Sequence, residues 1–539
     1  MNEGKRSLPG NLPRSLSAGF LNLDSPIQKT KKLASKLKKK SRMSFINSIA
    51  RRLSGAGMEE SDGFVVVPPT PPQTDSAPSA PTISLSLKQK HSSIGLKHPN
   101  VKSNSYVASL TAASVVNEEE RAPLDIAVVM DISGSMSGGK LDLCKKTCLV
   151  LLNELKATDR FSLVTFGDDA KVEFSLAGLT ASNKVNAENK VKALRTNGCT
   201  NLSGGMTAGI QELQSATAPN AVRSVLLLTD GHANRGVSAP AGIISLLKGC
   251  LASESSANIS VNTFGYGEDH NAELLKGISE GSSTPGSYYF IETEDNVSSA
   301  FGDCIGGLLS VAAQNIKIKI RETTGAQLEV SDQRAVRTTP SSFTLQIGDI
   351  LADETKDFLI ECSNFTGETA CVEVQVEYVD IVNSRPAISP VESITTVLPD
   401  DATISEVDTY VALQALRVLV ANTLRSAGTQ ARARNITQAR ESVQSTITKI
   451  TEESTDLTLT PTDQVIVTSL LKDLNDCLSG MTTYHEYEQR GSKMMSMKAQ
   501  MHTYQRCNES DETSFNMYRG TTSSKAVYAR KLKGASNAY

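Results

Sequence analysis

The strongest constraint on the fold is a regular alternation of apolar runs and helical patterns across residues 122–311. Leu124–Met130 is a near-continuous apolar run, as expected of a strand buried on both faces. Four more runs follow, at Phe161–Phe166, Ser224–Thr229, Ile259–Phe264 and Tyr288–Ile291, with helical spacing between them at 184–194, 241–252 and 295–310. The alternation predicts an α/β domain whose doubly wound, mostly parallel sheet is covered by helices on both faces. Ligands of such sheets bind just beyond the carboxyl ends of the strands.

After residue 312 the apolar residues recur at every second position, which is the pattern of a strand with one buried face. Ile316–Ile320 and Val372–Glu377 show it most clearly. We therefore expect an antiparallel β sandwich over residues 313–400. Two runs of the same period, Ile83–Leu87 and Tyr106–Leu110, lie before the α/β domain, within 83–120. We expect these strands to join the sandwich, so that the α/β domain is inserted in it; the alternative is a sandwich that simply follows the α/β domain.

Residues 404–510 have the spacing of a helical region, and 511–539 form a tail. One helix is expected to begin at Ser405 and to end at Gly428. A second is expected after Thr460, because Thr460 suits the N-cap, Pro461 the first helical position and Asp463 the third.

The first 82 residues have the composition of a disordered segment. Lys29–Arg52 holds ten Lys and Arg and no acidic residue, and residues 61–82 are rich in Pro and Ser. Three interpretations of Lys29–Arg52 stay open: a solvated tail, a nuclear-import or nucleic-acid patch, and a contact with an anionic membrane. Phe45 is its single aromatic residue, so we do not expect sequence-specific binding of nucleic acid.

The chain shows no sign of export or of membrane insertion. Its N-terminus lacks the apolar core of a signal peptide, and no window approaches the ~18 consecutive apolar residues of a membrane span. The nine cysteines are odd in number, widely scattered and without a CxxC pair, which favours reduced thiols and argues against a structural zinc site. We expect a cytoplasmic protein, with nuclear and membrane-peripheral locations as alternatives.

Side chains with oxygen atoms follow two of the expected strands and occur in a loop between them. Asp131, Ser133 and Ser135 follow the first strand, Thr200 lies in a later loop before a helix, and Asp230 ends the strand Ser224–Thr229. Two carboxylates and three hydroxyls are hard ligands, which suit Mg²⁺ or Mn²⁺ and not zinc. The sequence thus predicts a divalent metal site at the carboxyl edge of the sheet.

This set, in this order, resembles the metal-ion-dependent adhesion site (MIDAS) of von Willebrand factor A (vWA) domains. All five family positions are present, and Gly231 follows Asp230 as in the family. The resemblance implies that Asp131, Ser133, Ser135, Thr200 and Asp230 hold the metal, directly or through water. It also implies a protein partner that donates a Glu or Asp to the ion.

The order of segments resembles that of the plant RING–vWA ubiquitin ligases of the wavy-growth type, through Arg121–Ile126, Tyr484–Gly491 and His502–Arg506. However, residues 1–120 contain no Cys, so the eight paired ligands of a RING are missing. Phosphate-loop and GxGxxG motifs are absent, and His232 is the one candidate base near Asp230. We therefore expect no catalytic residue and no enzyme. The hypothesis is a non-catalytic scaffold; the alternative is a substrate-recruiting component of a ubiquitin ligase whose RING comes from another chain.

Overall fold

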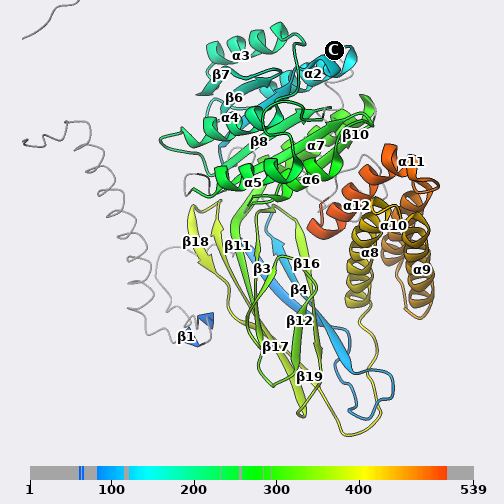
Figure 1. Cartoon of the computed structure of the whole chain (residues 1–539). Helices are drawn as coiled ribbons and strands as arrows, with labels where there is room; N and C mark the ends of the chain where they lie inside the picture. Colours follow the sequence, from blue (N-terminus) through cyan, green and yellow to red (C-terminus); the bar gives the residue numbers. More distant parts are fainter. Residues whose placement is uncertain are drawn as a thin grey trace, which may run out of the picture. The chain divides into compact units, whose positions relative to one another are not determined.

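The computed structural model describes residues 60–61, 64–65, 82–114, 121–230, 232–253, 256, 258–282, 284–292 and 294–506. The chain divides into two compact units, Met1–Pro72 and Gln73–Tyr539. In the first unit, β1 (Glu60–Ser61) and β2 (Phe64–Val65) pair antiparallel. Almost all of the segment expected to be disordered, the whole of Lys29–Arg52 and the tail 511–539 lie outside the described residues. All that follows concerns the second unit (Figure 1).

The predicted doubly wound sheet is confirmed. It has six strands in the order β10 (Tyr288–Ile291), β9 (Ile259–Tyr266), β8 (Val222–Thr229), β5 (Leu124–Asp131), β6 (Arg160–Phe166) and β7 (Ala170–Gly178). The first five are parallel, and all residues of β5, β8 and β9 are buried, as their apolar runs predict. The edge strand β7 runs antiparallel to β6 and was not predicted. Its sequence mixes exposed charged residues with apolar ones, because the strand lies at the edge of the sheet.

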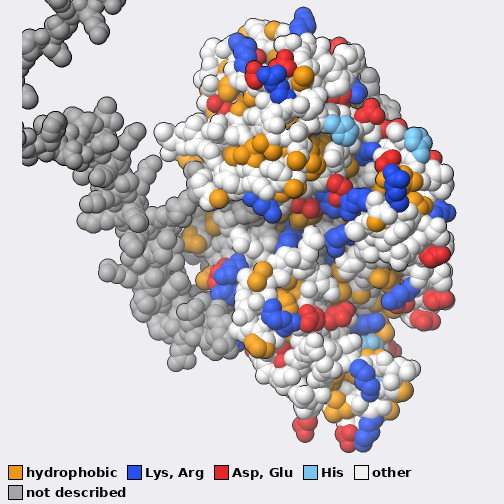
Figure 2. All heavy atoms as spheres, viewed as in Figure 1, with side chains coloured by type: hydrophobic (Ala, Val, Ile, Leu, Met, Phe, Trp, Pro, Cys, Tyr) orange, Lys and Arg blue, Asp and Glu red, His pale blue; other side chains and the backbone are white. Residues whose placement is uncertain are grey.

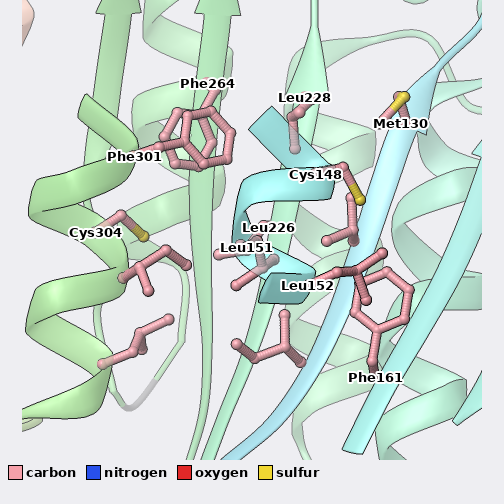
Figure 3. Packing of buried hydrophobic residues seen from close by; sticks show 14 of the residues in the cluster. Met130, Cys148, Leu151, Leu152, Phe161, Leu226, Leu228, Phe264, Phe301 and Cys304 are labelled. Carbon is pink, nitrogen blue, oxygen red and sulfur yellow. The ribbon is translucent and has the colours of Figure 1, made fainter. Parts of the chain in front are cut away.

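Helices cover both faces of this sheet, and each face has its own apolar core. One face carries α2 (Gly139–Glu154), α3 (Ala181–Ala193) and α7 (Glu294–Leu309). The other carries α4 (Leu202–Gln214), α5 (Pro240–Leu251) and α6 (Ala272–Glu280). Figure 3 shows the first core, where Cys148 and Leu152 of α2 and Phe301 of α7 pack on the sheet, and Phe301 stacks on Phe264 with ring centroids 4.0 Å apart. The two cysteines of α2, Cys144 and Cys148, are free and buried.

Two antiparallel sheets form a sandwich beside this domain. One has the order β13 (Ala335–Thr339), β14 (Ser342–Ile347), β11 (Val311–Glu322), β17 (Thr369–Asp380) and β18 (Arg385–Ile388), with β15 (Ile350–Leu351) on β11 and β19 (Glu392–Val397) on β17. The other has the order β12 (Gln327–Val330), β16 (Thr355–Ser363), β4 (Ser103–Ala112) and β3 (Ile83–Gln89). Residues of both sheets share one apolar core. Because β4 pairs with β16 along its whole length, the α/β domain is inserted between strands of one sandwich.

The C-terminal region is helical, with α8 (Thr409–Arg432), α9 (Ile436–Thr455), α10 (Pro461–Ser479), α11 (Tyr484–Glu486), the π-helix η4 (Tyr487–Gly491) and α12 (Ser492–Tyr504). Thr460 and Asp463 form a reciprocal capping box at the start of α10, as expected. The expected end of a helix at Gly428 is wrong, since α8 continues to Arg432. Ala427 and Ala431 are buried against neighbouring helices, and this packing outweighs the ~1 kcal/mol cost of a glycine within a helix.

Helix α12 ties the helical region to both other parts. Gln500 accepts a hydrogen bond from the main-chain N of Tyr288 at 2.7 Å, at the edge strand β10. On the sandwich side, Gln505 exchanges two hydrogen bonds with the main chain of Asp357, at 2.8 and 2.9 Å. Among the described residues, no helix has the length and apolar character needed to cross a membrane.

Candidate metal site

The two carboxylates of the predicted site emerge side by side from the sheet. Strands β5 and β8 are adjacent and parallel, with Met130 opposite Leu228. Asp131 is the last residue of β5, and Asp230 directly follows β8. Because parallel strands end at the same edge, the two side chains reach the same point beyond it.

A chain of hydrogen bonds joins four of the five predicted residues. The main-chain N of Ser133 donates to Asp131 Oδ1 at 2.8 Å. The hydroxyls of Ser133 and Ser135 are 3.1 Å apart, and Ser135 Oγ donates to Asp230 Oδ1 at 2.8 Å. Asp131, Ser133 and Asp230 are buried, whereas Ser135 is exposed. The cluster therefore has a buried base of carboxylates and one hydroxyl that faces solvent.

Asp131 is the most enclosed member of the cluster. Its second oxygen, Oδ2, accepts a hydrogen bond from Thr229 Oγ1 at 2.6 Å. Burial raises the pKa of the Asp131 carboxyl, while the hydrogen bonds from Ser133 and Thr229 oppose this shift and the nearby charge of Asp230 adds to it. A buried carboxylate beside a second one is stabilised by a cation, and this is what a metal at this edge would supply.

Thr200 belongs to a loop that lies against the Asp131–Ser135 turn. The main-chain N of Asn197 donates to Ile132 O at 2.5 Å, and Gly134 N donates to Gly198 O at 3.1 Å. Thr200 itself is buried, and its main-chain N donates to the side chain of Asn234 at 2.8 Å. The structure thus brings Thr200 to the cluster through its loop, while the hydrogen-bond chain described above runs through the other four residues.

Three supporting residues were missed by the sequence analysis: Thr229, Asn234 and Lys140. The side chain of Lys140, at the start of α2, contacts Asp230 Oδ2 as an ion pair. The first turn of a helix is an unfavourable position for a cation, because the positive end of the helix dipole lies there. The contact with the Asp230 carboxylate therefore stabilises Lys140 in this position. The sequence did offer one indication of this contact, because Lys140 follows Asp131 closely and lies in the first turn of the expected helix.

The donor set fits Mg²⁺ or Mn²⁺. All of its candidate ligand atoms are carboxylate or hydroxyl oxygens, the donors that these hard cations take. Within the described part of the chain, no three His, Cys, Asp or Glu side chains gather into a group that could hold a metal. A cation at this edge would therefore depend on the hydroxyls of Ser133, Ser135 and Thr200 as well as on the two carboxylates.

The rim of the site carries opposite charges. Asp168 accepts a hydrogen bond from Cys199 N at 3.2 Å and lies 3.3 Å from the guanidinium of Arg235. The Cys199 hydrogen bond holds the pKa of the exposed Asp168 carboxyl below its usual range, with a smaller contribution from Arg235. His232 is exposed in the loop after β8. These residues surround the cluster as solvated loop residues.

Comparison with known proteins identifies the domain that carries this site. Residues 125–303 match the family model of the von Willebrand factor type A domain. This part of the chain is a vWA domain. The predicted residues lie at the carboxyl edge of its sheet, at the ends of β5 and β8 and in the loop that carries Thr200.

Three similar proteins extend the comparison. The E3 ubiquitin-protein ligase WAV3 of Arabidopsis thaliana is 28% identical over 254 residues, which are 46% of this chain and 32% of the ligase. The inter-alpha-trypsin inhibitor heavy chain H3 of Homo sapiens is 31% identical over 162 residues, 29% of this chain and 18% of the inhibitor chain. The structure of a von Willebrand factor type A protein from Catenulispora acidiphila has a TM-score of 0.55 at 18% identity, and the match covers 71% of this chain and 88% of that one.

The similarity extends beyond the vWA domain in fold but covers only part of each relative named here. The structural match shows a shared fold that continues beyond the vWA domain, since the domain alone is shorter than the matched share of the chain. The chain spans about a third of the length of the ligase. One relative is named as an enzyme and another as a chain of an inhibitor, so their names assign no reaction here. The domain and its relatives support a role in protein interaction.

Proposed function

We propose that this chain is a non-catalytic protein-binding scaffold. In this proposal, Asp131, Ser133, Ser135, Thr200 and Asp230 hold a Mg²⁺ ion, and a protein partner donates a Glu or Asp carboxylate to it. The observation that carries the proposal is the hydrogen-bonded series from Asp131 to Asp230, which reaches solvent at Ser135. When bound, the ion would supply a positive charge that a partner's carboxylate can reach.

Hydrogen bonds within the chain fix the orientation of the candidate ligands. The main chain of Ser133 and the hydroxyl of Thr229 fix the two oxygens of Asp131 in different directions. Ser135 orients Asp230, and Asn234 fixes the loop that presents Thr200. Two carboxylates and neutral hydroxyls leave a divalent ion nearly balanced in charge yet still attractive to one further anion.

The alternative proposal is a substrate-recruiting component of a ubiquitin ligase whose RING is supplied by another chain. Its support is the similarity to a named plant ubiquitin ligase over almost half of this chain. Copurification of a RING protein or a ubiquitin-conjugating enzyme with the tagged chain would favour this alternative. Recovery of a partner without either would favour the simpler scaffold.

The test is affinity capture of the tagged full chain from its own cells, in parallel with Mg²⁺ and with EDTA, read by mass spectrometry. The variant Asp131→Asn keeps the side-chain shape and removes one carboxylate charge. Asp169→Asn, at a side chain that is 84% exposed on the rim, is the matched control. We expect a partner that EDTA and Asp131→Asn remove and Asp169→Asn retains. The same partners in all samples would contradict the proposal.

A further inference from the structure

A groove between α2 and α3 begins beside the metal site. Ser137 and Gly138, which follow the Asp131–Ser135 turn, line it together with Thr196, which precedes the loop of Thr200. From there it runs along α2 to Leu149 as an open groove of about 700 Å³. Both of its walls are thus continuous with segments that carry predicted metal ligands.

Cationic side chains dominate the lining of this groove. Lys145 and Lys146 of α2 face Lys192 and Arg195 of α3 and its C-terminal end, and Asp142 is the one acidic residue in the lining. Leu141 is buried and Leu149 half-buried, so the groove also has an apolar floor. Figure 2 shows basic side chains, with acidic ones among them, on the surface over α3. The net positive charge lies along a surface long enough to follow an extended chain.

Local structure explains some of these cations and leaves others. Arg195 donates to the main-chain oxygens of Lys192 and Leu194, where it caps the end of α3. Lys192 is 3.5 Å from Glu188, and Lys145 is 3.4 Å from Asp142, both as pairs along one helix. Each pair has one well-exposed side chain, Lys192 at 58% and Asp142 at 71%, and such solvent-screened pairs contribute little to stability, typically below ~1 kcal/mol. These local contacts account for Arg195, Lys192 and Lys145. They do not account for Lys146 or for the net positive charge of the groove.

We propose that this groove binds an acidic, extended segment of the partner protein. The inference rests on the proposed function: the same segment would place one carboxylate at the metal site and further Glu or Asp residues in the groove. From Ser137 to Leu149 the groove follows ~18 Å of helix, at ~1.5 Å per residue, which ~5 to 6 extended residues span. The partner motif is therefore a Glu or Asp followed by an acidic stretch with a small apolar side chain for the floor.

The test uses two fluorescent peptides of equal length and the full chain with Mg²⁺. One peptide carries a single terminal Glu in a Gly, Ser and Gln background, and the other carries further Glu residues at alternate positions. The double variant Lys146→Glu/Lys192→Glu reverses two exposed charges of the groove. Lys190→Glu is the matched control, since Lys190 is exposed in the same last turn of α3 but does not line the groove.

We expect the acidic peptide to bind the wild type at least tenfold more tightly than the single-Glu peptide at low salt. The double variant should lose this advantage, and Lys190→Glu should keep most of it. An equal advantage in all three proteins would overturn the inference, and so would equally tight binding of a short oligothymidine, which would indicate an unselective polyanion surface.

Binding of both peptides is also measured in EDTA, which separates this inference from the proposed function. If EDTA abolishes binding of the single-Glu peptide while the double variant leaves the acidic advantage intact, the metal site stands and the groove proposal fails. If EDTA has no effect but the double variant removes the advantage, the groove binds acidic segments and the metal-dependent function fails.

Discussion

Two Lys–Asp clusters in this molecule have similar chemistry but opposite surroundings. At the carboxyl edge of the vWA domain, Lys140 contacts Asp230, which lies beside Asp131, and the lysine side chain is 35% exposed. In the helical region, Lys498 of α12 lies 2.5 Å from Asp473 of α10, and both side chains are at most 1% exposed. One cluster opens to solvent, and the other is enclosed by helices.

The balance of charge differs as well. Asp473 also contacts His502 at 3.0 Å, and Lys498 lies 3.4 Å from Asp476, so the buried cluster provides a partner for each charge. At the vWA edge, two carboxylates lie together, and one partly exposed lysine pairs with Asp230. The comparison indicates that the enclosed, balanced cluster holds helices together, whereas the open edge with excess carboxylate is suited to bind a further cation.

The largest effect is expected from Asp473→Ala. Removing this carboxylate leaves Lys498 buried without its main counter-charge, which typically costs about 3 to 5 kcal/mol. Hydrogen-exchange mass spectrometry should show faster exchange throughout α10 and α12. Asp476→Ala is the control, because Asp476 is 38% exposed and its loss should cost less than ~1 kcal/mol. Equal effects of the two variants would mean that burial does not distinguish these contacts.

The open edge should respond to Mg²⁺ instead. At a concentration 100 times the dissociation constant, a cation bound only by the folded protein adds about 2.7 kcal/mol to its stability. We expect thermal unfolding of the vWA domain to shift upward with Mg²⁺ in the wild type and to stay constant in Asp131→Asn. A similar shift in both proteins would place the effective cation elsewhere.

The buried cluster also predicts a pH dependence. Burial alone would raise the pKa of Asp473, but hydrogen bonding by His502 and the charge of Lys498 hold it at about 2. Because this pKa lies below the unfolded value of 3.8, the carboxylate stabilises the fold fully above that pH, and the contribution is lost as pH falls toward 2. The contribution is about 2 kcal/mol. Exchange in α10 and α12, compared at pH 5 and 2.5, should change less in Asp473→Asn than in the wild type; an identical pH response would contradict the assignment.

The smallest effect is expected from Lys140→Met. Removing a positive charge in contact with Asp230 should raise affinity for Mn²⁺ about fivefold, or ~1 kcal/mol, measured by calorimetry. Lys146→Met, at an exposed lysine of the same helix, should change it less. A weaker affinity in Lys140→Met would instead show that the lysine positions Asp230 for the metal.

The open edge could be predicted from the sequence because its parts are local. The apolar run of β5 ends at Asp131, and a parallel sheet brings the ends of β5 and β8 to one edge, so four of the five candidate ligands follow from strand order. Thr200 lies in a loop before α4 and does not follow from it. Lys140 was missed because its contact with Asp230 depends on how α2 turns back over the sheet, which no periodicity shows.

The enclosed cluster could not be predicted in this way. Lys498 lies in a Met-rich stretch with many polar residues, and its burial depends on packing between α12 and α10, which are separated in sequence by α11 and η4. Likewise, α9 lies in the region expected to be helical, but its bounds were not predicted, because eight of its 20 residues are Thr or Ser and only four are buried. Long-range packing, rather than local propensity, determines these features.

The most direct measurement of the metal site is anomalous X-ray scattering from crystals of the full chain grown with Mn²⁺. We expect one strong peak at the carboxyl edge, with ligand oxygens ~2.0 to 2.4 Å from the ion. These oxygens should belong to Asp131, Ser133, Ser135, Thr200 or Asp230, or to waters that these residues bind. The peak should be absent from crystals of Asp131→Asn. Ordered density for Lys140 against Asp230 with no peak at this edge, at saturating Mn²⁺, would contradict the proposal that this vWA domain binds its partner through a metal.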